Sequence, residues 1–164
     1  MKGPICSICM RSDFLCAACN EKVRTEKLDK LTLDVVRFLG SLEDRYKNLR
    51  DAEVRQVMDV GKALVIVAGK GSGGKIVGRG GVIAKDLNAR FGMVRVVEEG
   101  TREEMIQSLL FPVKPIGVNK VYGGGGEKYK LRVKMADKKK VPMGNDEFRE
   151  ITKKLGAEAE IFFE

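Results

Sequence analysis

The sequence contains no histidine and no tryptophan, and only 6% of its residues are aromatic. The absence of histidine removes the most frequent general base and excludes every His-containing metal site. No apolar run approaches the ~20 residues of a membrane-spanning helix, and Met1–Cys6 does not resemble the start of a signal peptide. We therefore expect a cytoplasmic, non-catalytic protein with neither a membrane nor a small-molecule substrate as partner.

Charge, by contrast, is abundant, and it is mostly positive. The chain has 31 Lys and Arg against 23 Asp and Glu, for a net charge of +8. Residues 113–140 contain nine of these cations and two acids, and so account for +7 of the total. A balance of this kind favours a polyanionic partner such as RNA.

Part of this basic region has the alternation of a strand. Four cations, which we call the cation row, alternate with apolar residues and should share one strand face: Lys128, Lys130, Arg132 and Lys134. Lys138–Lys140 extends the row. It is expected to attract RNA phosphates; the alternative is a solvated edge strand that is charged against aggregation.

All four cysteines lie in the first 24 residues, which we call the cysteine segment. Their spacing is Cys6-x2-Cys9-x6-Cys16-x2-Cys19. Paired CxxC motifs in a reducing compartment predict a metal site rather than disulfides, and four thiolates favour tetrahedral zinc. An iron–sulfur cluster is the main alternative. Because four protein ligands close the coordination sphere, the site is expected to be structural.

Hydrophobic periodicity and turn residues predict the remaining elements. An amphipathic helix is expected over 25–49, capped by Thr25 or Asp29, and a strand hairpin over 53–68 through Gly61-Lys62. The later elements are a helix 82–91 ending at Gly92, a strand 93–98, a helix 101–110 with a capping box, strands 116–122 and 128–135, a helix 146–155, and a strand 159–163.

The order of these elements repeats. Gly92 and Gly156 each follow a helix and precede a strand, and they lie 64 residues apart. We interpret this as an internal duplication. The copies differ at one place, because Val141-Pro-Met-Gly144 stands where the first copy has Gly78-Arg-Gly-Gly81.

Two glycine clusters follow the apolar strand 63–68, and they allow three interpretations. Gly69-x-Gly71-x-x-Gly74, with Glu98 ending the next strand, resembles a dinucleotide fingerprint, but Gly78–Gly81 interrupts the helix that it requires. Gly69-x4-Gly74-Lys75 resembles a nucleotide phosphate loop, but Ile76 replaces the Ser or Thr that would hold magnesium.

The third interpretation is a GxxG loop, Gly78–Gly81, between two short helices beside a three-stranded sheet. Such a loop holds the backbone of about four nucleotides of single-stranded RNA in KH domains. Ala84 occupies the usual place of a large aliphatic residue, so Ile83 or Leu87 should provide the packing. The expected RNA contacts in this copy are the four loop residues and three flanking lysines: Gly78, Arg79, Gly80, Gly81, Lys70, Lys75 and Lys85.

Over residues 50–164 the layout resembles archaeal NusA-like proteins, which are relatives of the bacterial transcription elongation and termination factor and contain two type II KH modules. The expected fold is α+β. The cysteine spacing predicts a zinc knuckle (1–24), which is not part of the usual two-module core of that family. The resemblance implies a first KH module with a long N-terminal helix (25–100) and a degenerate second module (101–164). Each module has the order α-β-β-α-α-β or a reduced version, a three-stranded sheet with helices on one face. Pro142 and the missing first glycine should disable the loop of the second copy.

The expected function is therefore non-catalytic binding of single-stranded RNA in transcription elongation or termination. The alternative is an adaptor in which the zinc knuckle and the helix 25–49 dock on RNA polymerase or a ribosomal subunit.

Overall fold

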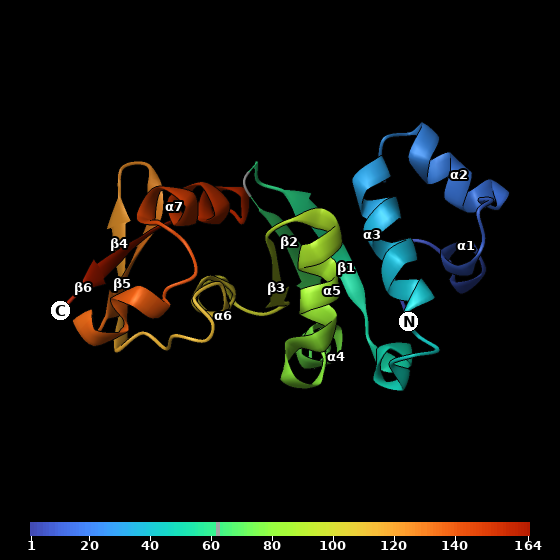
Figure 1. Cartoon of the computed structure of the whole chain (residues 1–164). Coiled ribbons are helices and arrows are strands. Elements are labelled where there is room, and N and C mark those ends of the chain that lie inside the picture. Colours follow the sequence, from blue (N-terminus) through green and yellow to red (C-terminus); the bar gives the residue numbers. More distant parts are fainter. Residues whose placement is uncertain (62) are drawn as a thin grey trace. The chain divides into compact units, whose positions relative to one another are not determined.

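The computed structural model describes residues 1–61 and 63–164; Lys62, at the expected turn of the first hairpin, lies outside the described residues. The described chain is a mixed α+β protein with seven α-helices and two three-stranded sheets (Figure 1). It divides into two compact units, Met1–Glu99 and Gly100–Glu164, and each unit contains one of the sheets.

The first unit begins with three helices, α1 (Ser7–Arg11), α2 (Ala17–Arg24) and α3 (Lys30–Ser41). The expected helix over 25–49 is wrong in its extent. The helix α3 starts only after Asp29, whose carboxylate accepts a hydrogen bond from the Thr32 amide at 2.7 Å. It stops at Ser41, and a separate 3₁₀ turn, η1, spans Lys47–Asp51. Leu49 lies in this turn and is completely buried. The helix-like spacing of apolar residues in the sequence therefore continues past the end of α3, although the helix does not.

The first sheet has the order β1-β2-β3, with bounds Val54–Asp59, Leu64–Ala68 and Val94–Glu98. β1 and β2 form the expected antiparallel hairpin, whereas β2 and β3 are parallel. A parallel pair needs a crossover connection. It is supplied by α4 (Gly73–Val77), a 3₁₀ turn η2 (Arg79–Gly81) and α5 (Val82–Phe91). As expected, α5 ends at Gly92, which has a φ of +83°.

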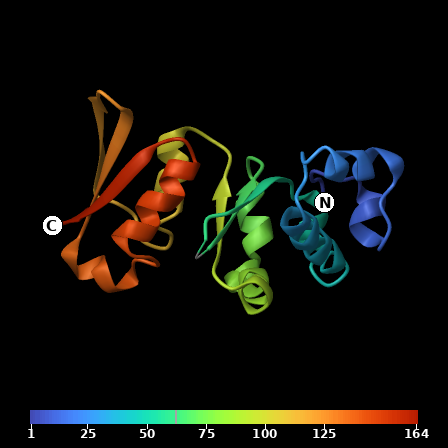
Figure 2. The ribbon, with the colours of Figure 1, turned by 90° about the horizontal axis from the view of Figure 1, so that it is seen from above.

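Helices α3, α4 and α5 bury their apolar sides against one face of this sheet (Figure 2). Ile66 of β2 belongs to the same core cluster as Leu39 of α3, Ile76 of α4 and Leu87 of α5, and all four are fully buried. Each such side chain contributes about 1.5–3 kcal/mol to folding. Ile83 is also buried, so both residues that were expected to provide the packing next to Ala84, Ile83 and Leu87, lie in the core.

The second unit repeats this topology. Its elements are α6 (Arg102–Ser108), β4 (Gly117–Gly123), β5 (Gly126–Val133), η3 (Met135–Lys140), α7 (Asn145–Lys154) and β6 (Glu158–Phe163). The sheet order is β4-β5-β6, again with one antiparallel and one parallel pair. The expected capping box at Thr101 and Glu104 is present. The two copies differ where the first has α4, because the second has the 3₁₀ turn η3.

The sequence predicts no membrane-spanning segment. Within residues 1–61 and 63–164, no helix combines the length and the apolar character that crossing a bilayer requires.

Candidate functional site

The four cysteines come together as their spacing predicts. Cys6 and Cys16 immediately precede α1 and α2, and Cys9 and Cys19 lie in the first turns of these helices. Because both CxxC motifs have this geometry, the four Sγ atoms all lie within 4.8 Å of one another. None of the four cysteines, all of which are described, forms a disulfide. The cluster is positioned to hold a metal ion.

Backbone amides already favour thiolates in this cluster. The Cys16 amide donates to Cys9 Sγ at 3.1 Å, and the Cys6 amide donates to Cys19 Sγ at 3.4 Å. The backbone amide of Cys19, with the thiols of Cys19 and Cys9, lowers the pKa of Cys16 to about 7. The amide of Cys16 favours the Cys9 thiolate, but burial and the three neighbouring thiols outweigh it and raise the pKa of Cys9 to about 12. Four adjacent thiols cannot all ionise without a cation, which is the condition that a bound metal satisfies.

The cysteine segment also packs into the first unit. Ile5, Cys9, Met10 and Cys19 are buried in the same core cluster as α3. The helix α1 approaches α3 so closely that a Cβ on Gly40 would lie 3.2 Å from the Met10 carbonyl oxygen. Sequence reasoning missed these core contacts, although Ile5 and Met10 were the apolar residues that could have indicated them.

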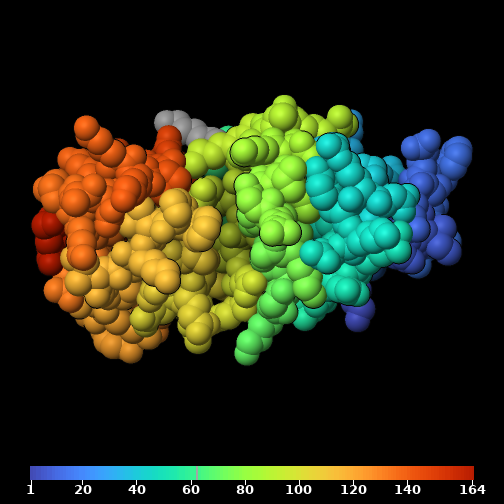
Figure 3. Space-filling model, turned by 60° about the horizontal axis from the view of Figure 1, so that its bottom comes forward, coloured from blue at the N-terminus to red at the C-terminus, as the bar shows by residue number. Residues whose placement is uncertain are grey.

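The GxxG loop (Gly78–Gly81) forms the link between α4 and α5. Gly78, Gly80 and Gly81 have φ values of +80°, +66° and +75°, a region that side chains disfavour. A Cβ on Gly78 would lie 2.8 Å from Ile83 Cγ1, whereas nothing lies within 4 Å of one on Gly80 or Gly81. Gly78 is therefore required by packing, and Gly80 and Gly81 leave their backbone open to a ligand. The segment from α4 to α5, green to lime in Figure 3, lies at the molecular surface.

The first glycine cluster, Gly69–Gly74, is occupied by acidic side chains of the same unit. The Glu98 carboxylate accepts hydrogen bonds from the amides of Gly73, at 2.9 Å, and Gly71, at 3.3 Å. A Cβ on Gly69 would lie 2.7 Å from Glu53 Oε2. The amides that a nucleotide phosphate would need are therefore already used, which supports rejecting both nucleotide interpretations. Glu98 acts as a partner of the turn, and not in the ribose-binding role that the dinucleotide fingerprint would give it.

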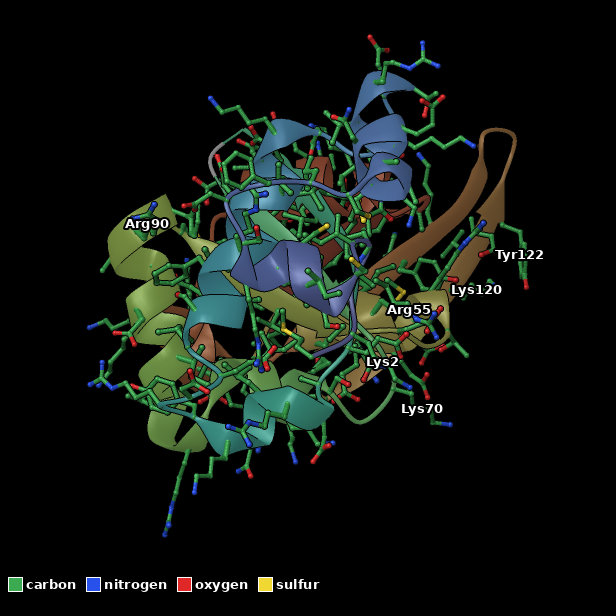
Figure 4. The ribbon with its side chains drawn as sticks, turned by 90° about the vertical axis from the view of Figure 1, so that its right-hand side faces the viewer. Lys2, Arg55, Lys70, Arg90, Lys120 and Tyr122 are labelled. Carbon is green, nitrogen blue, oxygen red and sulfur yellow. The ribbon has the colours of Figure 1, made fainter. Side chains whose placement is uncertain are left out.

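The lysines expected near the loop have different surroundings. Arg79 and Lys85 are exposed, on the loop and in the first turn of α5. Lys75 of α4 donates to the Asp51 carbonyl at 3.3 Å. Lys70 precedes α4, and Figure 4 shows it projecting on the side of the unit away from Arg90 of α5. Arg79 and Lys85 are therefore the cations best placed to extend the GxxG loop.

The cation row has the predicted alternation. Tyr129, Leu131 and Val133 of β5 are buried, while Lys128, Lys130 and Arg132 lie on the other face. That face also receives acids from β6, which the sequence did not indicate. Lys128 pairs with Glu158 at 3.5 Å, and Arg132 pairs with Glu164 at 3.6 Å. Lys130 lies 5.4 Å from the centre of the Phe162 ring. Lys134 follows β5 and is exposed.

Comparison with known proteins gives a likeness of fold. No family model and no curated protein matches the chain. Among solved structures, it is similar to the crystal structure of APE1850, with a TM-score of 0.51 and 20% sequence identity. The match covers 79% of this chain and 96% of that chain. At this identity, the likeness concerns the arrangement of elements alone.

Proposed function

We propose that this chain is a non-catalytic RNA-binding protein in which the GxxG loop holds the backbone of single-stranded RNA. The observation that carries the proposal is the loop itself, which has three glycines of positive φ, two of them open to solvent, and the exposed Arg79 between two helices. Glycines at these positions let phosphates approach the backbone, and the arginine adds charge.

The surrounding topology supports the proposal. The first unit has the order α3-β1-β2-α4-α5-β3, which is the order of a type II KH module. The second unit has a similar order but lacks α4, and its corresponding loop contains Pro142. Two such modules in one chain are the basis for proposing a NusA-like role in transcription elongation or termination. The cation row adds electrostatic attraction in the second unit.

The central experiment replaces Arg79 and Gly80 by Asp. Asp tolerates the left-handed conformation of Gly80 better than most residues, so the variant should fold. We expect binding of oligouridylate in a gel-shift assay to fall at least tenfold, because two negative charges face the phosphates. The matched control replaces Lys27 and Gly124 by Asp, with the same change in net charge at exposed positions outside the loop. Equal losses in both variants would mean that the protein binds RNA through net charge alone.

For the cysteine cluster, we propose structural zinc. Four thiolates in two CxxC motifs form the usual closed zinc site. Elemental analysis of protein purified without added metal should give about one zinc per chain. Iron with a visible charge-transfer absorption would instead identify an iron–sulfur cluster.

A second candidate function, docking on RNA polymerase or a ribosomal subunit, is favoured by the surface of the cysteine segment. Ile8 is 76% exposed and Phe14 is 83% exposed. Large apolar side chains this exposed on a small segment are typical of contact anchors. If the adaptor hypothesis is correct, partners captured from native extract will survive nuclease treatment and will be lost when Ile8 and Phe14 are both replaced by Ser. Loss of all partners on nuclease treatment alone would leave RNA as the bridge.

A further inference from the structure

The second unit carries a surface groove that includes no residue of the GxxG loop and shares only Lys134 with the cation row. The groove has a volume of about 630 Å³. The connection between α6 and β4 supplies its apolar lining, namely Pro112, Val113, Pro115 and Ile116. Ile116 is 47% exposed, and two further exposed apolar residues, Phe111 and Met135, adjoin lining residues in the sequence. Apolar side chains gathered at a surface depression indicate an interaction site.

The charged lining of the groove is mostly positive. Lys114, Lys134 and Lys140 line it, and Asp137 is the one acid among the lining residues described. Asp137 is already paired with Lys140, at 3.1 Å. Lys114 and Lys134 are exposed and belong to no ion pair found among the described residues. The groove therefore combines an apolar wall with two lysines that can form ion pairs with a negatively charged partner.

We propose that this groove binds a short acidic peptide segment of a partner protein. One apolar side chain of the peptide packs against Pro112–Ile116, and its carboxylates pair with Lys114 and Lys134. Single-stranded RNA fits the groove less well, because its lining contains no aromatic ring and no arginine on which a base could stack. Proline and aliphatic walls instead suit the apolar side chains of a peptide. The inference does not depend on RNA binding at the GxxG loop.

Fluorescence anisotropy of the full chain tests the proposal with a labelled peptide of alternating Glu and Leu. A Glu–Ser peptide has the same charge without apolar side chains, and oligouridylate serves as the nucleic-acid competitor. We expect the double variant K114E/K134E to lower the affinity for the Glu–Leu peptide about tenfold or more. Ile116→Ser should lower it several-fold through the apolar wall alone. The control K27E/K30E makes the same charge change at exposed sites in the first unit and should bind as the parent does.

The two peptides, oligouridylate and the variants together distinguish peptide binding in the groove from the other outcomes. A Glu–Leu peptide that binds more tightly than the Glu–Ser peptide, with the loss confined to K114E/K134E and I116S, supports the groove. No binding, or equal binding of the two peptides, overturns it. If oligouridylate displaces the peptide, and K114E/K134E loses RNA more than peptide, the groove contacts nucleic acid instead. The R79D/G80D variant should retain peptide binding, so failure of this proposal is distinguishable from failure of the RNA proposal.

Discussion

At the scale of single residues, the glycines of the GxxG loop have different tasks. Gly78 has a positive φ and is also in close contact with Ile83, which is buried in the core. Gly80 has a positive φ but open space around it. One position is therefore constrained by folding and the other by what approaches from solvent.

We therefore predict that alanine lowers the free energy of unfolding more at position 78 than at position 80. Gly78→Ala should lower the free energy of unfolding by about 2–3 kcal/mol, because backbone strain and a clash with Ile83 add together. Gly80→Ala should cost about 1–2 kcal/mol, from backbone strain alone. Chemical denaturation measures both. Gly74→Ala, inside α4 with nothing within 4 Å, is the control and should be neutral or slightly stabilising. Equal losses at 78 and 80 would contradict the packing role of Gly78.

A buried carboxylate gives a second prediction at this scale. Glu43 is 3% exposed and accepts from the Met1 ammonium at 2.9 Å and from Arg11 at 2.6 Å. Burial alone would raise the pKa of Glu43, but these two cations hold it below its usual value. The stabilisation is therefore present above the unfolded pKa of about 4.3 and lost as pH falls through the lower folded pKa.

Glu43→Gln should therefore lower the free energy of unfolding at neutral pH by about 1–3 kcal/mol. It should also flatten the loss of stability on acidification, which denaturant titrations at several pH values will show. Asp44→Asn alters an adjacent carboxylate that is 87% exposed and should change stability by about 0.5 kcal/mol or less. If the Gln variant lost stability with falling pH in the same way as the parent, Glu43 would not be the group that makes stability depend on pH.

At the scale of elements, the cysteine cluster joins α1 to α2, and α1 packs against α3. These helices have five and eight residues, too few for stability on their own. If the cluster holds the proposed zinc, chelation should increase deuterium uptake over residues 1–24 while the amides of β2 stay protected. Cys9→Ser should reproduce this pattern, and Ser12→Ala should not. Uptake that rises equally throughout the first unit would show that the metal supports the whole core.

The sequence predicts those features that depend on neighbouring residues along the chain, and it misses those that depend on tertiary packing. The helix ending at Gly92 and the box at Thr101 and Glu104 could be predicted, because caps and glycines act locally. The end of α3 at Ser41 could be predicted only in part: Gly40-Ser41 indicates a kink, but the apolar spacing runs on to Leu49, and only packing shows that the helix stops. The clustering of the cysteines also followed from spacing. The contact of Glu98 with Gly71 and Gly73 did not, because it depends on the parallel pairing of β2 and β3.

At the scale of the whole molecule, the net charge of +8 overstates the positive potential that the proposed RNA ligand would meet. Lys128 and Arg132 of the cation row are paired with Glu158 of β6 and with Glu164, which follows it. The parallel register places Glu158 opposite Lys128, and Glu164 follows the last residue of β6, Phe163, relations that a charge count along the sequence cannot show. Much of the attraction must come from cations without such partners.

Removing these acids should therefore expose the cation row. E158Q/E164Q should strengthen oligouridylate binding about two- to fivefold at low salt and steepen its dependence on salt concentration. D13N/D34N, the same charge change at exposed sites in the first unit, should have a smaller effect. Gel shifts over a series of salt concentrations measure both slopes. An unchanged slope in E158Q/E164Q would leave the row as a solvated strand face.

The repeated topology predicts where mutations that abolish the proposed RNA binding should fall. The described residues form two sheets of the same strand order, but among them a GxxG loop that joins two helices occurs in the first unit alone. If the RNA proposal is correct, the second copy supplies positive charge but cannot replace the loop, so a mutation in the loop of the first copy is not compensated. A random screen for loss of RNA binding in folded protein should recover changes clustered between residues 76 and 85. Changes at residues 141–144 of the second copy should instead leave RNA binding intact wherever the protein still folds, a condition that limits changes at the buried Met143 and at Gly144, the N-cap of α7.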